Sequence, residues 1–201
     1  MTRQKNLRIL SEDEIRKLLS TIKNDTDQMI VEVCLNHGLR NLETMSLKKK
    51  HIDFDTRRIE IIDSKNDKDR QVPIPDHFEK KLENWVGDLS HEDYLFPSPV
   101  FPDQHLTTRY FQKLMHRVCL SAGLYPDEIQ SVEEVTVKLD RQERITPHSL
   151  RHTYATRLLR NGTPMGKVKK LLGHSSVKTT IDTYQHLTIE DTRPHINAIT
   201  Y

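Results

Sequence analysis

The chain has 201 residues, of which 35% are hydrophobic and 30% are charged, and its formal net charge is +2 at pH 7. This length fits one globular domain with a sizeable core or two small ones, and no apolar run approaches the roughly 18 residues that a membrane span needs. The N-terminal segment MTRQKNLRIL lacks the apolar core and cleavage site of a signal peptide, so we expect a cytoplasmic protein rather than a membrane or secreted one.

Two helices are predicted at the start of the chain. A capping box of Ser11 and Glu14 opens the first, and an apolar stripe continues it. The second is predicted over residues 26–37. Cys34 in this helix and Cys119 further along both occupy apolar helical positions, which indicates buried free thiols rather than a disulfide bond.

A tight elbow is predicted after the second helix. Gly38 supplies the left-handed conformation that stops a helix, and Asn41 is expected to cap a short turn. Arg40 therefore lies between two helices, and we expect the packing of Leu39 and Leu42 to hold it there.

A small antiparallel sheet is predicted next. Ile59 and Ile61 mark its best strand, the polar run 64–70 reads as a turn, and residues 71–74 form the returning strand. Lys65 is then expected at the tip of this hairpin.

The middle of the chain is predicted to be mostly helical. Helices are expected at 76–89 and 107–122, with a proline-rich loop at 96–102 between them. Residues 125–144 mix the apolar periods of helix and strand, so both remain open there.

Two further helices are predicted towards the C-terminus, each opened by a threonine–proline pair. Thr146 opens the first and Gly162 stops it, whereas Thr163 opens the second and Gly173 stops it.

Charge is distributed unevenly along the sequence. Residues 140–170 contain eight Lys and Arg side chains against two acidic ones, whereas residues 76–93 contain six acidic side chains against two lysines. This polarity suits a protein with one anion-binding face and an acidic back. Solvated helix faces would give a similar pattern, so charge alone does not identify a partner.

The stretch 146–184 contains residue types that suit a phosphate diester. His148 and Arg151 are three residues apart in a predicted helix and therefore share a face. Arginine matches two phosphate oxygens with a planar fork, and histidine exchanges a proton near neutral pH. His174 follows a helix stop, and Tyr184 follows a short turn. Each of these residues alone is more typical of an exposed or half-buried structural side chain, but their combination at this spacing indicates a phosphate-binding site.

Four sequence motifs occur in a fixed order: NHGLRNLE at 36–43, SKNDKDRQVPI at 64–74, TPHSLRH at 146–152, and LLGHSS from 171 followed by Tyr184. Together they resemble the motifs of the tyrosine recombinases, the family of phage-type integrases and site-specific recombinases. The resemblance covers most of the chain. It implies an α+β, mainly α-helical catalytic-domain fold with a small three-stranded antiparallel sheet.

The resemblance also implies a reaction, in which a tyrosine attacks the scissile phosphorus of DNA and forms a 3′-phosphotyrosine. Tyr184 is the implied nucleophile, His148 its proton acceptor, and Lys65 the acid that protonates the leaving 5′-oxygen. The implied catalytic residues are Arg40, Lys65, His148, Arg151, His174 and Tyr184. Glu43 is expected to orient the arginines and histidines of this cluster without contacting the substrate. The alternative is that Glu43 is an ordinary exposed carboxylate on a helix. No metal, other cofactor or ATP is expected.

The hairpin motif departs from the family pattern. Ser64 and Asn66 stand where the family commonly has glycines, which leaves the general acid open between Lys65 and Lys68.

The domain organisation implied by the resemblance is a single catalytic domain over residues 1–201. Residues 1–10 would form an arm or linker, and 185–201 a tail that docks either on a neighbouring protomer or on its own domain. The N-terminal helical domain with which family members clamp DNA is absent from this sequence, so we favour a fragment over a minimal enzyme.

Double-stranded DNA is the implied partner, with a homotetramer on DNA and a monomer possible in solution. Cations around the motifs are expected to contact phosphates and to set affinity and its salt dependence. They are Lys48, Lys49, Lys50, Arg57, Arg58, Lys68, Arg70, Lys167, Lys169 and Lys170. Such enzymes are typical of prokaryotic, viral and plasmid-encoded mobile genetic elements.

Three other functions compete with this interpretation. A zinc site is disfavoured because His148 and His152 lack the intervening glutamate of a zinc-binding helix. A non-catalytic DNA-binding regulator would not need Tyr184. A type IB topoisomerase would use a similar set of residues, so the motifs alone do not separate DNA relaxation from recombination.

Overall fold

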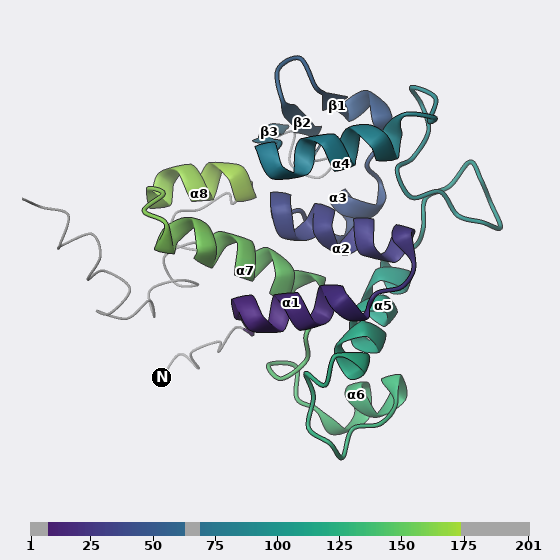
Figure 1. The fold of residues 1–201 in the computed structure, drawn as a ribbon, viewed down its shortest axis with the longest axis vertical. Coiled ribbons are helices and arrows are strands. Elements are labelled where there is room, and N and C mark those ends of the chain that lie inside the picture. Colours follow the sequence, from purple (N-terminus) through teal and green to yellow (C-terminus); the bar gives the residue numbers. More distant parts are fainter. Residues whose placement is uncertain (1–7, 63–68, 174–201) are drawn as a thin grey trace, which may run out of the picture.

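The computed structural model describes residues 8–62 and 69–173, which form a mainly helical fold with one small sheet (Figure 1). In chain order the elements are α1 Glu12–Thr21, α2 Asp25–His37, α3 Asn41–Met45, η1 Lys49–His51, β1 Ile52–Asp53, β2 Arg58–Ile61, β3 Arg70–Pro73, α4 Asp76–Val86, α5 Thr108–Ser121, α6 Val132–Lys138, α7 Pro147–Arg160 and α8 Met165–Leu172. The predicted α+β class and small antiparallel sheet are confirmed.

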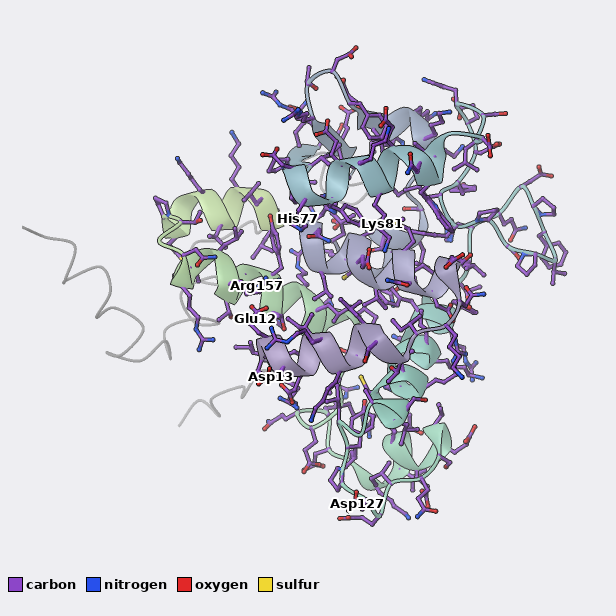
Figure 2. The ribbon with its side chains drawn as sticks, viewed as in Figure 1. Glu12, Asp13, His77, Lys81, Asp127 and Arg157 are labelled. Carbon is purple, nitrogen blue, oxygen red and sulfur yellow. The ribbon has the colours of Figure 1, made fainter. Side chains whose placement is uncertain are left out.

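Helix α1 begins at the predicted capping box and is fixed to α7. The hydroxyl of Ser11 accepts a hydrogen bond from the Glu14 amide, and the Glu14 carboxylate accepts one from the Ser11 amide. Arg157 of α7 points towards Glu12 of α1, with its Nε 2.9 Å from Oε1 (Figure 2). The Leu10 amide donates to Thr153 Oγ1 at 3.0 Å, so the start of the described chain is held against α7.

Helix α2 ends at Gly38 for two physical reasons. Its φ of 62° lies in the left-handed region, which strains any residue with a Cβ. A Cβ at this position would also overlap the ring of Tyr154 on α7. The glycine therefore stops α2 and lets α7 pack closely against it.

The three strands form an antiparallel sheet in the order β1-β2-β3. Ile59 pairs with Val72, and Ile61 pairs with Arg70. Residues that face each other in an antiparallel pair lie on the same side of the sheet, so all four side chains share one face. That face is buried, whereas Glu60 and Gln71 between them are exposed.

Helix α4 lies next to the sheet and beside α2 (Figure 1). Its buried side chains include Phe78 and Leu82. On the α2 side, Lys81 Nζ lies 2.6 Å from Glu32 Oε2, and His77 is labelled beside the same helix in Figure 2.

Helix α8 is attached to the domain by a small apolar cluster of its own. Val168 and Leu172 of α8 are fully buried against Tyr154 and Ala155 of α7, separately from the main core. Burying one aliphatic side chain of this size contributes about 1.5–3 kcal/mol. The cluster therefore holds α8 to α7, while Leu171 near its C-terminal end packs against the main core.

Residues 125–144 contain both the predicted helix and irregular chain. Ser131 caps α6 by accepting a hydrogen bond from the Glu134 amide at 3.2 Å. Val135 and Leu139 point inward, whereas Val137 is 82% exposed. The mixed apolar periodicity arises because the helix is only seven residues long and extended chain adjoins it.

The expected packing of Leu42 is wrong, because its side chain is 52% exposed. Helix α3 has only five residues and turns Thr44 and Met45 into the core, which leaves Leu42 on the outer side. Leu39 is fully buried as expected.

The two cysteines are buried and free, as predicted. Among the described residues, no helix has both the length and the apolar character needed to cross a bilayer.

Candidate active site

Arg40 is held at the start of α3 by Glu43. Its backbone amide donates a hydrogen bond to Glu43 Oε2 at 2.7 Å, and its Nη1 donates to Oε1 at 2.6 Å. Gly38 ends α2 and Leu39 is buried, so the chain reaches Arg40 in a fixed direction. The side chain of Arg40 is 34% exposed.

Glu43 is the common partner of three arginines. Arg70 binds it with a bidentate fork, Nη1 to Oε1 at 2.8 Å and Nη2 to Oε2 at 2.7 Å. Arg151 lies further away, with Nη1 3.8 Å from Oε2. The side chains of Glu43, Arg70 and Arg151 are 8%, 5% and 4% exposed.

The environment of Glu43 keeps it ionised. Burial alone would raise its pKa, but the hydrogen bonds and charge of Arg70, the Arg40 amide and the charge of Arg151 lower the pKa to about 2. Glu43 is therefore a carboxylate at neutral pH and contributes a negative charge among the three guanidinium groups. The alternative of an exposed helix carboxylate is excluded by its burial.

The same three arginines bind the C-terminal end of α8 through three consecutive carbonyl groups. Arg70 Nε donates to the oxygen of Leu171 at 2.7 Å, Arg151 Nη2 donates to that of Leu172, and Arg40 Nη2 donates to that of Gly173 at 3.0 Å. The last carbonyls of a helix have no partners within the helix and carry partial negative charge. Arginine donors therefore satisfy groups that would otherwise be left unpaired.

Two glycines make this arrangement possible. Gly38 presents its carbonyl oxygen to Arg151 Nη1 at 2.7 Å. Gly173 has a φ of 64° and ends α8, and a Cβ there would lie 3.0 Å from Arg70 Nη1. The glycines that the sequence identified as helix stops are thus also contact points for the arginines.

His148 lies in the first turn of α7, one turn before Arg151. Partial burial and the positive charges of Arg151 and Arg40 lower the pKa of His148, while the Glu43 carboxylate opposes them. Its imidazole is therefore neutral at pH 7 and able to accept a proton. Its ring contacts that of His152 edge to face, with the centroids 5.9 Å apart.

The structure thus brings together four of the predicted site residues, Arg40, Glu43, His148 and Arg151. Lys65, Lys68, His174 and Tyr184 lie outside the described residues. The described chain reaches the site again at Gly173, immediately before His174 in the sequence.

The side chain of Arg70 faces into the protein, which the sequence prediction of a phosphate contact did not anticipate. Its side chain is buried, and its guanidinium is bound to Glu43 and to Leu171. The sequence contained a signal for this position, because Arg70, Val72 and Ile74 alternate with Gln71 and Pro73 and so share one face of a strand. That alternation indicates an inward arginine, which needs a buried partner.

The other described cations lie at the surface, several of them in ion pairs. Lys48 and Lys50 both bind Glu92, with shortest Nζ–Oε distances of 3.2 and 2.8 Å. Lys49 Nζ donates to the carbonyl oxygens of Gly87 and Leu89.

The remaining predicted phosphate contacts differ in their partners. Arg57 pairs with Asp76 and Glu79, and Arg58 donates to Gln71. Among the residues described, no ion pair involves the α8 lysines, which are Lys167, Lys169 and Lys170.

No three His, Cys, Asp or Glu side chains gather as metal ligands within residues 8–62 and 69–173.

Comparison with known proteins identifies relatives of this chain in sequence and in fold. The model of the phage integrase family matches residues 8–191. A tyrosine recombinase from Pseudothermotoga lettingae is 32% identical over 190 residues, which is 92% of this chain and 58% of that protein. This chain therefore spans little more than half the length of that relative.

Two solved structures share the fold. The crystal structure of XerA recombinase has a TM-score of 0.71 at 29% identity, covering 96% of this chain and 66% of the other. A Tn1549 transposon integrase in complex with a circular intermediate DNA has a TM-score of 0.73 at 19% identity, covering 98% of this chain and 67% of the other.

Proposed function

This chain belongs to the phage integrase family, and on that premise we propose that it is the catalytic part of a site-specific DNA recombinase. The enzyme would cut and rejoin DNA strands through a covalent 3′-phosphotyrosine formed on Tyr184. One observation carries the proposal: Arg40 and Arg151, from distant parts of the chain, both bind the C-terminal end of α8, and the charges of both act on the imidazole of His148.

The convergent groups supply what phosphoryl transfer requires. Negative charge builds on the non-bridging oxygens of the scissile phosphate, and preorganised cations stabilise it. Arg40, whose side chain is one-third exposed, would bind these oxygens first. Arg151 would complete the clamp once DNA binding makes its guanidinium accessible. His174 would donate a further hydrogen bond.

Proton transfer completes the proposed reaction. A tyrosine has a pKa near 10, so only about one in a thousand is phenolate at pH 7. The neutral imidazole of His148 would accept the phenol proton of Tyr184 as the phenol oxygen attacks phosphorus. Lys65, or Lys68 in its place, would give a proton to the leaving 5′-oxygen, a step worth about 10²–10⁴-fold in rate. The bond energy stays in the phosphotyrosine, so neither ATP nor a metal ion is required.

Double-stranded DNA is the proposed partner, and a tetramer on DNA is the proposed assembly. The basic side chains Lys167, Lys169 and Lys170 on α8 support phosphate binding next to the site, since α8 ends at the arginine cluster.

The proposed reaction is tested by trapping its intermediate. A pool of nicked duplexes with a randomised target segment would be incubated with the protein, since a nick lets the cleaved strand diffuse away. A denaturing gel should then reveal a covalent protein–DNA adduct for the wild type and for Tyr201→Phe, and none for Tyr184→Phe. An adduct that survives Tyr184→Phe would refute the assignment of the nucleophile.

Two outcomes favour the competing functions. Sequence-independent relaxation of supercoiled plasmid would identify a topoisomerase. DNA binding without any adduct would identify a non-catalytic regulator.

A further inference from the structure

Arg70 connects three separate segments of the chain. It lies on β3, it binds Glu43 of α3 through both Nη atoms, and it binds the Leu171 carbonyl at the end of α8 through Nε. All three nitrogens of its guanidinium are therefore directed into the protein. Such a bidentate arginine–carboxylate pair is charge-assisted and geometrically specific.

The position of Arg70 determines what Glu43 leaves for Arg151. Each oxygen of Glu43 already accepts one hydrogen bond from Arg70 and one from Arg40. Arg151 therefore remains 3.8 Å from Glu43, beyond hydrogen-bond distance, and donates to Gly38 and Leu172 instead. Without Arg70, the carboxylate would have unsatisfied oxygens that attract Arg151 out of this position.

Arg70 also fixes the end of α8. The apolar cluster of Val168 and Leu172 attaches this helix to α7, but Leu171 is bound directly to Arg70. Gly173 lies so close to the Arg70 side chain that a Cβ at this position would come within 3.0–3.3 Å of Arg70 atoms. The carbonyl groups that receive Arg40 and Arg151 are therefore placed partly by Arg70.

We propose that Arg70 is a positioning residue for the reaction rather than a ligand of DNA. It saturates Glu43 and anchors the end of α8, so that Arg40 and Arg151 are kept next to the place where the scissile phosphate would bind. This inference rests on the proposed function for its catalytic consequence, but its structural part is testable without DNA.

A kinetic test distinguishes a positioning role of Arg70 from a role in binding DNA. Arg70→Gln should lower the rate of adduct formation at saturating nicked duplex on the order of 10- to 100-fold, because small displacements of reacting groups cost that much. The dissociation constant for the same duplex and its salt dependence should stay within twofold of wild type. Arg70→Lys should also be slow, since an ammonium cannot reproduce the fork. A weakened affinity, with a salt slope reduced by about 1 and an unchanged rate at saturation, would overturn the proposal.

Arg117→Gln is the matched control. Arg117 also pairs with a mostly buried carboxylate, with Nη2 2.7 Å from Asp27 Oδ2, but it lies on α5 and contacts none of the residues of the arginine cluster. This variant should keep the wild-type rate and affinity. An equal loss of rate in Arg117→Gln would mean that any broken buried ion pair suffices, and would overturn the specific role of Arg70.

A structural measurement distinguishes failure of this inference from failure of the proposed function. Amide hydrogen exchange at 171–173 should become faster in Arg70→Gln than in the wild type and the Arg117→Gln control. Amides of α1 and α5, which do not contact Arg70, should exchange as in the wild type, which guards against simple unfolding. Unchanged exchange at 171–173 in Arg70→Gln would refute the positioning role, whether or not the wild type forms an adduct.

Discussion

Glu43→Gln is the substitution whose effect on stability follows most directly from the structure. It keeps the shape of the side chain but removes the negative charge that faces three arginines. The pKa of Glu43 is held at about 2, against an ordinary value of 4.5. This difference corresponds to about 3 kcal/mol of stability at neutral pH. The glutamine amide would also point N–H donors at guanidinium donors, and breaking a buried pair costs about 3–5 kcal/mol.

Urea unfolding measures this effect and its pH dependence. A carboxyl group with a lowered pKa in the folded state stabilises the fold above its unfolded pKa, near 4.5, and loses that contribution as the pH falls towards 2. The wild type should therefore lose about 3 kcal/mol across this window through Glu43. The variant should be less stable by about 3–5 kcal/mol at pH 7 and should lack that part of the acid slope.

Glu92→Gln provides the control for burial. The hydrogen bonds and charges of Lys50 and Lys48 also lower the pKa of Glu92 to about 2, but its side chain is 63% exposed. Surface ion pairs contribute little to stability, so this variant should unfold nearly as the wild type does. A loss below about 1 kcal/mol in Glu43→Gln, with an unchanged acid slope, would contradict the reasoning, as would an equal loss in both variants.

Three further predictions concern other parts of the domain. Gly38→Ala should destabilise the fold by at least about 1–2 kcal/mol in urea unfolding, because alanine is strained at the left-handed φ of this position. Overlap of the new Cβ with Tyr154 should add to this cost, and an unchanged free energy of unfolding would contradict the prediction. His148→Gln should slow adduct formation about 10²–10⁴-fold. In the wild type the inflection of the rate with falling pH should lie below 6.5, because the pKa of His148 is lowered; an inflection above 6.5 would exclude His148 as the base. Cys34 and Cys119, whose burial raises the pKa of each thiol to about 12, should react with a thiol reagent only after unfolding, so rapid labelling of the native protein would contradict their burial.

The elements that the sequence predicted well are those specified by nearby residues. The capping box at Ser11 and the helix stops at Gly38 and Gly173 depend on interactions within a few positions, which are visible in the sequence. The helix stripe of α5 and the sheet were predicted for the same reason. The roles of the site residues were predicted from the resemblance of the four motifs to those of a known family.

The parts that the sequence did not predict depend on contacts between distant segments. Arg40 and Gly173 are 133 residues apart, and Arg70 and Leu171 are 101 apart, so no local pattern specifies their pairing. The alternation along 70–74 indicates an inward arginine, but no local pattern identifies Glu43 and Leu171 as its partners. Leu42 was misassigned because a five-residue helix turns only part of its apolar surface inward.

Three adjacent peptide groups at one helix end each receive a different guanidinium, and this one-to-one matching makes the cluster sensitive to the register of α8. Advancing the helix by a single residue, about 1.5 Å along its axis, would offer every arginine the wrong oxygen at the same moment. The cluster should therefore assemble or come apart as a unit. Substitutions that shift α8 along its axis should then disturb all three arginine contacts together rather than one at a time.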